Sequence, residues 1–287
     1  MKAILRSLRA WLILSRASNL PTVWSNCVAG WWLGGGENRQ SLPFLLAGAT
    51  CLYTGGMFLN DAFDANFDRQ YRKERPIPSG AISPKTVWLA GFVWLALGAT
   101  LLFLTSKVTG CYGLLLLISI VLYDAVHKGT AFSPLLMALC RFLLYVGSGS
   151  SGIRGVNGWV IGDAAALAAY IVGLSYLARR ESFSGTLRHW PILFLAIPIL
   201  LALFRGVSRN SELALLLALV LGLWILRCLR STLWSAERNM SRTVSELLAG
   251  IVFVDWVAVA DAPRELGFVF IALFLSALLF QRFVPAT

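Results

Sequence analysis

Between positions 60 and 68 the chain carries four side chains that can donate oxygen ligands to a cation. Asn60, Asp61, Asp64 and Asp68 directly follow an apolar run that ends at Leu59. A helix turns by about 100° per residue, so all four side chains fall on one face. Three carboxylates crowded at a membrane boundary repel one another unless a cation compensates them. Magnesium prefers such oxygen ligands, so we predict that these four residues are metal ligands and catalytic residues.

A strongly basic segment follows the acidic stretch at once. Its positive side chains are Arg69, Arg72, Lys73 and Arg75, and prolines at 76 and 78 with a glycine at 80 predict a turn-rich loop. Guanidinium and ammonium groups next to metal-binding carboxylates are what a diphosphate and its metal ion require together. The sequence therefore predicts that Arg72, Lys73 and Arg75 bind a diphosphate.

The elements that position these residues are membrane-spanning helices. Of the 287 residues 57% are hydrophobic and 14% are charged, whereas a soluble domain averages about 25% charged residues. Apolar runs long enough to cross a bilayer recur throughout the chain. We predict an all-α transmembrane bundle of about nine spans, or ten, that forms a single domain over residues 1–287. The expected spans are 17–34, 42–60, 84–106, 109–126, 133–150, 159–178, 190–206, 212–234, 244–262 and 265–283.

The basic residues also predict the orientation of this bundle. Seventeen of the 25 Lys and Arg residues fall at the N-terminus and in alternate connections, including the 69–80 segment. Because positive residues accumulate on the cytoplasmic side, we expect the N-terminus and the loops of the acidic site to be cytoplasmic. The net charge of +11 lies in short loops between apolar spans. This pattern indicates a topology signal and attraction to lipid headgroups, and not nucleic-acid binding.

The acidic stretch and the Arg-Pro-x-Pro-Ser-Gly segment that begins at Arg75 resemble the first signature of the UbiA superfamily of intramembrane prenyltransferases. The resemblance implies a Mg²⁺-dependent enzyme that transfers an isoprenyl group from an isoprenyl diphosphate to a lipophilic or aromatic acceptor. It also implies diphosphate-binding roles for Tyr123 and Lys128 near the end of the fourth span. An Arg-x-x-Asn element places Arg16 near the substrate and Asn19 at the edge of the cavity.

The sequence departs from this family at the end of the sixth span. The family has a second Asp-x-x-x-Asp cluster there, whereas this chain has Ser175-Tyr176-Leu177-Ala178-Arg179-Arg180-Glu181. Two interpretations stay open. Either Glu181 is the only second-site carboxylate, with Arg179 or Arg180 neutralising charge in place of a metal, or no second metal binds. Both Arg179 and Glu181 are retained as candidate diphosphate-site residues.

Two other classes of protein are compatible with parts of the sequence. Arg141 and Asp255 lie within apolar runs, where charged residues commonly serve ion pathways, so an ion-coupled transporter is one alternative. A transporter does not explain the register of the acidic residues. The other alternative is a non-catalytic protein that binds isoprenoids or lipids, since the second acidic cluster is altered. A structural ion pair is a further role for Asp255.

Overall fold

The computed structural model is all-helical over the residues that it describes, which are all except 1, 38, 180–189, 210, 234–239 and 287. The short 3-10 helix η1 (Ala17–Asn19) leads into the helices of the bundle. The α-helices are α1 (Lys2–Leu14), α2 (Leu20–Leu33), α3 (Ser41–Phe63), α4 (Ala65–Tyr71), α5 (Pro84–Thr105), α6 (Lys107–Val126), α7 (Ser133–Gly149), α8 (Gly158–Arg179), α9 (Trp190–Arg209), α10 (Glu212–Leu233), α11 (Met240–Ala258) and α12 (Arg264–Gln281).

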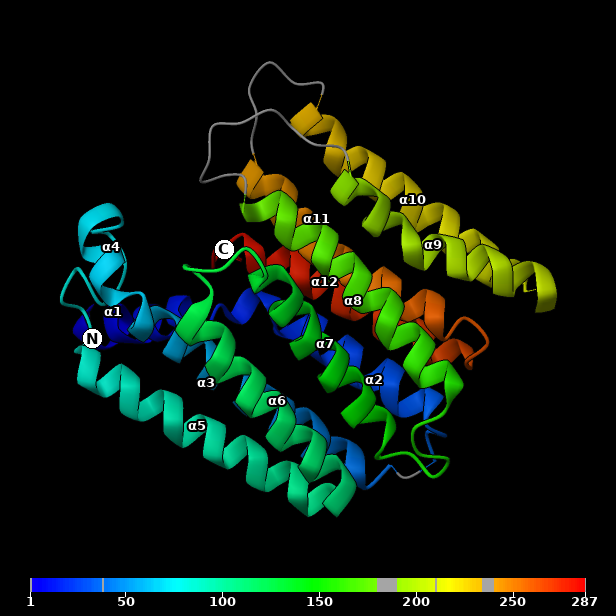
Figure 1. Cartoon of the computed structure of the whole chain (residues 1–287), viewed down its shortest axis with the longest axis horizontal. Helices are drawn as coiled ribbons and strands as arrows, with labels where there is room; N and C mark the ends of the chain where they lie inside the picture. Colours follow the sequence, from blue (N-terminus) through cyan, green and yellow to red (C-terminus); the bar gives the residue numbers. More distant parts are fainter. Residues whose placement is uncertain (1, 38, 180–189, 210, 234–239, 287) are drawn as a thin grey trace.

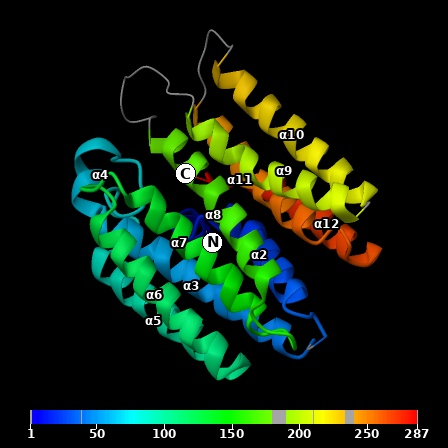
Figure 2. The same ribbon diagram turned by 45° about the vertical axis from the view of Figure 1, so that its right-hand side comes forward.

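The long helices run side by side, and α2 lies at the centre of the bundle (Figures 1 and 2). Helix α2 packs against α3, α7, α11 and α12. The helices α3, α5 and α6 form one side, while α8 to α11 form the other. The short helix α4 lies at one end of the bundle together with α1 (Figure 1). The C-terminal segment reaches the same end, where Asn19 Nδ2 donates to Ala286 O at 2.9 Å.

The outer faces of several helices are strongly apolar. On α5 the exposed side chains include Leu89, Phe92 and Val93, and on α10 they include Leu219 and Leu223. By length and composition, six of the described helices can cross a membrane: α3, α5, α6, α8, α10 and α12. Large exposed apolar patches are unfavourable in water but suit a lipid environment.

Each expected span coincides with a helix, which confirms the predicted all-α bundle. The two final apolar runs, interrupted by Asp255 and separated by Pro263, are the separate helices α11 and α12. Helices α7 and α9 contain shorter apolar stretches, at Ser133–Gly149 and Trp190–Arg205. The number of membrane crossings, nine or ten, stays a prediction.

Glycines allow α3 and α5 to approach closely, and this contact fixes the helix that carries the acidic residues. A Cβ at Gly55 would lie 2.9 Å from Gly91 O and from Leu95 N. A Cβ at Gly98 would lie 2.8 Å from Leu52 N. Because backbone atoms cannot move aside as flexible side chains can, these positions require glycine.

Candidate active site

The four predicted metal ligands lie where α3 passes into α4. Asn60 and Asp61 are in the last turn of α3, Asp64 separates the helices, and Asp68 is in the first turn of α4. The backbone hydrogen bonds Asp64 N to Asn60 O (3.0 Å) and Asp68 N to Asp64 O (2.9 Å) keep the helical path across the junction. All four residues are buried, with at most 6% exposure. The helical face that these four residues were expected to share therefore points into the protein.

Two arginines neutralise the carboxylates on this face. Arg75 Nη1 lies 3.1 Å from both Asp61 Oδ1 and Asp68 Oδ2, so a single guanidinium group bridges them. Arg16 Nη2 donates to Asn60 Oδ1 at 3.1 Å and lies 3.4 Å from Asp61 Oδ1. The structure thus brings Arg16 and Arg75 to the acidic residues, and their roles in diphosphate binding stay predictions.

Arg16 has an unusual backbone conformation. Its φ of 43° and ψ of 48° lie in the left-handed region, and among the described residues no other non-glycine has a positive φ. This conformation costs about 1–2 kcal/mol for a residue with a Cβ. It occurs at the junction of α1 and η1, and Tyr53 Oη donates to the carbonyl of Arg16 at 3.2 Å. The turn directs the arginine side chain toward α3.

The end of α6 supplies the other wall of the site. Asn60 Nδ2 donates to Asp124 Oδ1 at 3.0 Å, which joins α3 to α6. Lys128 Nζ lies 2.7 Å from Asp64 Oδ1, and His127 Nε2 lies 3.4 Å from the same oxygen. Lys128 therefore lies beside the acidic cluster, and its role in diphosphate binding stays a prediction.

The contacts between Asp64 and α6 change the pKa values of both partners. Burial raises the pKa of the Asp64 carboxyl, but His127 and Lys128 outweigh it and lower that pKa below its usual 3.8. Burial lowers the pKa of His127, but its contact with Asp64 outweighs this and raises the pKa above 6.5. The site therefore favours an ionised carboxylate beside a protonated imidazole.

The other predicted diphosphate-binding residues have different positions. The Tyr123 ring stacks on His127 at 5.2 Å, at the edge of the cluster. Arg72 and Lys73 are exposed just after α4, and the described residues show no hydrogen bond or ion pair to either side chain. The side chain of Arg179 and all of Glu181 lie outside the described residues.

The expected loop at 69–80 is partly helical, because α4 extends to Tyr71. Arg69 therefore lies on a helix, where it pairs with Asn66 Oδ1 at 2.9 Å on the exposed side. The loop begins only at Arg72, which caps α4. Proline and glycine are confined to positions after 75, so they do not prevent one further helical turn after Asp68.

Sequence analysis missed Asp124 and His127 as members of the site. Asp124 is 3% exposed although it is a carboxylate near a span end, and it contacts Asn60. The available signal was the four-residue spacing of Asp124 and Lys128, which brings both to one side at the C-terminal end of α6. The expectation for Lys128 rested on the family resemblance, which does not include Asp124 or His127.

The cluster contains carboxylate oxygens suited to a metal ion. Across the described part of the chain, Asp68 Oδ1 and Asp124 Oδ2 are buried oxygens without a hydrogen-bond partner. Within the same residues, no group of three or more Asp, Glu, His and Cys side chains is arranged as a metal site. Magnesium commonly takes only one or two protein carboxylates and completes its shell with phosphate oxygens and water. The buried carboxylate oxygens of the cluster fit magnesium binding of this kind. That all four of Asn60, Asp61, Asp64 and Asp68 are metal ligands stays a prediction.

The two charged residues within the spans belong to a separate polar network. Arg141 Nη1 donates to Asn26 Oδ1 at 2.6 Å, and Asn26 Nδ2 donates to Asp255 Oδ2 at 2.7 Å. Ser25 Oγ also donates to Asp255 Oδ2. Arg141 and Asp255 are therefore linked through Asn26, and among the described residues Asp255 makes no ion pair with the basic side chain that the sequence analysis considered for it.

The fold and the site together define a class: an all-helical integral membrane protein with a buried acidic cluster, neutralised by basic side chains, at one end of its bundle. The UbiA prenyltransferase family matches residues 18–179, which is more than half of the chain. The protein belongs to this family.

Curated relatives match part of the chain. A digeranylgeranylglyceryl phosphate synthase of Ignicoccus hospitalis is 34% identical over 123 residues, which are 43% of this chain and 40% of that protein. A protoheme IX farnesyltransferase of Alkalihalophilus pseudofirmus is 34% identical over 127 residues, which are 43% of this chain and 38% of that protein. The matched region thus spans less than half the length of these relatives.

Solved structures share the fold over most of the chain. A UbiA homologue from Aeropyrum pernix has a TM-score of 0.66 at 14% identity and covers 87% of this chain and 98% of its own. A UbiA homologue from Archaeoglobus fulgidus, bound to DMAPP and Mg²⁺, has a TM-score of 0.55 at 16% identity and covers 93% and 97%. At such low identity the likeness establishes the fold.

Proposed function

We propose that this protein is a Mg²⁺-dependent prenyltransferase that transfers an isoprenyl group from an isoprenyl diphosphate to a lipophilic or aromatic acceptor. The observation that carries the proposal is the buried cluster of Asn60, Asp61, Asp64 and Asp68, faced by basic side chains from three separate segments. Family membership and the Mg²⁺ and DMAPP of the Archaeoglobus homologue support the same chemistry.

In the proposed reaction, the bond between the allylic carbon and the diphosphate oxygen breaks, and its electron pair leaves with pyrophosphate. The acceptor supplies the electron pair for the new bond and loses a proton. A bound magnesium ion supplies positive charge that stabilises the departing pyrophosphate. Asp68 and Asp124 have the free oxygens to hold that ion, beside Asn60, Asp61 and Asp64.

The basic residues of this chain are placed to bind the remaining phosphate charge. Arg16, Arg75, His127 and Lys128 surround the acidic cluster within 3.4 Å of its carboxylates. Fixed positive groups stabilise charge that develops in a transition state without having to reorganise. Because the site lies at an end of an apolar bundle, the tail of the substrate is expected to enter the membrane-facing interior, where water is excluded from an allylic cation.

One curated relative is named for the synthesis of digeranylgeranylglyceryl phosphate and the other for farnesyl transfer to protoheme IX, so the two names describe different reactions. The single domain over residues 1–287 and the cytoplasmic placement of the site remain part of the proposal. A non-catalytic isoprenoid-binding protein and an ion-coupled transporter are the alternatives that the test below separates.

The decisive variant is Asp64→Asn, which removes a charge while nearly preserving size. We expect pyrophosphate release from isoprenyl diphosphates to fall about a hundredfold or more, since lost charge stabilisation at a leaving group costs several kcal/mol. Release should be measured across magnesium concentrations with a panel of donors. A matched control is Asp261→Asn, which changes an exposed aspartate on the connection between α11 and α12.

The control should keep wild-type turnover, and both variants should remain monodisperse in detergent. A folded Asp64→Asn protein with wild-type turnover at low magnesium would remove the acidic cluster from catalysis. A wild-type protein that binds donors without releasing pyrophosphate would instead favour the non-catalytic alternative.

A further inference from the structure

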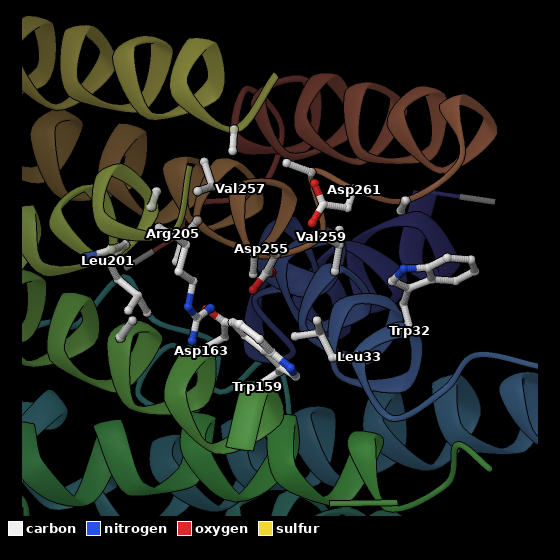
Figure 3. A pocket seen from close by; sticks show the side chains of 18 of the residues that line it. Trp32, Leu33, Trp159, Asp163, Leu201, Arg205, Asp255, Val257, Val259 and Asp261 are labelled. Carbon is white, nitrogen blue, oxygen red and sulfur yellow. The ribbon is translucent and has the colours of Figure 1, made fainter. Parts of the chain in front are cut away.

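A second cavity lies at the end of the bundle opposite the acidic cluster. Its volume is about 190 Å³, and its walls come from the ends of α2, α7, α9 and α11 and the beginnings of α8 and α10. Figure 3 shows side chains of these helices converging on it. Its rim carries exposed residues such as Trp159 and Asp261, while Asp163 and Asp255 lie deeper and are buried.

Two deeply buried side chains that line this cavity each have one oxygen without a hydrogen-bond partner in the described part of the chain. Asp255 is 0% exposed and Tyr145 is 1% exposed. Among the described residues, neither Asp255 Oδ1 nor Tyr145 Oη has a hydrogen-bond partner. Leaving a buried polar group unsatisfied is unfavourable, and the cost is larger for a charged group. A ligand that donates hydrogen bonds to Asp255 Oδ1 and Tyr145 Oη would satisfy both oxygens.

The other half of the Asp255 carboxylate is already occupied. Its Oδ2 accepts from Asn26 and Ser25, which fixes the carboxylate and leaves Oδ1 without a donor among the described residues. Arg141 compensates the charge only indirectly, through Asn26, and it does not line the cavity. The carboxylate is therefore positioned by protein donors but has no cation in contact with it among the described residues.

The charges deep in the cavity favour a positively charged occupant. Arg205 Nη1 lies 2.5 Å from Asp163 Oδ1, and its guanidinium carbon lies 4.7 Å above the Trp159 ring. Figure 3 shows this pair beside Asp255. Arg205 is thus committed to Asp163, and the second arginine of the lining, Arg154, is exposed at the rim. The buried Asp255 carboxylate, which has no cation in contact with it among the described residues, is best compensated by a bound cation.

We propose that this cavity is a binding site for a primary ammonium group, carried by a small amine or by a lipid headgroup. The ammonium would donate hydrogen bonds to Asp255 Oδ1 and Tyr145 Oη, and its three donors match these two acceptors with one to spare. The site is spatially separate from the acidic cluster, which lies at the other end of the bundle.

The test uses the full-length protein in detergent without magnesium or diphosphate. Binding of n-propylammonium and of n-propanol is measured by calorimetry and by the thermal midpoint, at matched ionic strength. We expect saturable binding of n-propylammonium and none of n-propanol over the same concentrations. Equal binding of the alcohol and the amine, or no binding of the amine, overturns the proposal.

Three variants locate the site. Asp255→Asn should weaken n-propylammonium binding at least tenfold, and Tyr145→Phe should weaken it several-fold. Tyr145→Phe loses no hydrogen bond seen among the described residues, so it keeps the proposal testable if Asp255→Asn does not fold. The matched control is Glu246→Gln on the same helix, whose carboxylate pairs with Arg242 away from the cavity. If Asp255→Asn folds, unchanged n-propylammonium binding in both variants overturns the proposal. If it does not fold, unchanged binding in Tyr145→Phe alone overturns it.

The source of the ammonium is identified in nanodiscs. If the occupant is a lipid headgroup, phosphatidylethanolamine discs should weaken the apparent n-propylammonium affinity relative to phosphatidylcholine discs, which have no ammonium N–H. Equal affinity in both discs assigns the site to a free amine. Either result supports the proposal only if binding also depends on Asp255.

Discussion

Arg75 holds Asp61 and Asp68 with one nitrogen, so a single side chain ties the loop after α4 to the acidic cluster. Its side chain is 16% exposed, while the two carboxylates are 7% and 2% exposed. An ion pair at such burial contributes little net stability compared with an apolar contact, but breaking it leaves charge without compensation. The arginine therefore matters for the integrity of the site before any substrate binds.

Replacing this arginine should destabilise the protein. We expect Arg75→Ala to lower the free energy of unfolding by about 3–5 kcal/mol in the absence of ligands, since the buried Asp68 loses its ion pair and Asp61 keeps only Arg16, at 3.4 Å. The thermal midpoint in detergent measures the effect. Arg72→Ala, three residues earlier and exposed, should change it by no more than about 0.5 kcal/mol. Similar losses in the two variants would contradict the bridging role of Arg75.

The contact between His127 and Asp64 predicts a pH dependence of stability. The folded-state pKa of His127 is raised above 6.5, so its stabilising contribution is complete below that value and is lost as pH rises through the folded pKa. The folded-state pKa of Asp64 is lowered below 3.8, so its contribution is present above 3.8 and is lost as pH falls through the folded pKa.

We therefore expect the difference in thermal midpoint between wild type and His127→Gln to shrink as pH is raised from about 6 to about 9. The measurement is made without magnesium, so that only the protein groups titrate. A constant difference over this range would show that the imidazole stays neutral in the folded protein and that its contact with Asp64 is not an ion pair.

At the scale of elements, the direct contact of α3 and α5 places the acidic cluster. Gly55 on α3 lies against the backbone of α5 near Gly91 and Leu95, with no space for a Cβ. The C-terminal turn of α3, which carries Asn60 and Asp61, lies only one to two turns further along the same helix. A change in this contact should therefore move the site as well as weaken the bundle.

We expect Gly55→Val to cost at least about 1–3 kcal/mol of stability, because overpacking against backbone cannot be relieved by a rotamer change. Pyrophosphate release should fall with it. The control is Gly222→Ala in α10, where the nearest atom to a new Cβ is Ile199 Cδ1 at 3.7 Å. That variant should be neutral or more stable by up to about 1 kcal/mol. Wild-type stability of Gly55→Val would show that α3 and α5 can separate without cost.

At the scale of the whole molecule, the two ends of the bundle differ in chemistry. One end holds the acidic cluster and its basic partners, while the other holds the second cavity with Asp255 and Tyr145 (Figures 1 and 3). The basic residues of the sequence predict that the first end is cytoplasmic. The two sites would then face opposite sides of the membrane.

Cysteine labelling tests this orientation. In a background without the five native cysteines, Arg72→Cys marks the first end and Ile153→Cys marks the other, and both positions are exposed. A membrane-impermeant reagent applied to intact cells should label position 153 and not position 72, and inverted vesicles should give the opposite result. Labelling of position 72 from outside would reverse the predicted topology.

The sequence by itself determined the helical membrane architecture and the location of the acidic cluster. Both depend on local properties: apolar runs of bilayer length, and the periodicity that turns Asn60, Asp61, Asp64 and Asp68 to one side. The sequence also shows that Arg75 lies close to that stretch, and its role in diphosphate binding stays a prediction. Family resemblance added Arg16, Tyr123 and Lys128, which the structure places at or beside the cluster.

Only the tertiary structure decided which charges meet. Arg72 and Arg75 are equivalent in type and nearly adjacent in sequence, yet only Arg75 turns inward onto Asp61 and Asp68. Asp124 became part of the site because α6 packs beside α3, a contact that no periodicity within α6 encodes. The second cavity likewise exists because the ends of several distant helices converge. Such pairings depend on how separate helices pack in three dimensions, and a linear pattern of residues does not specify that packing.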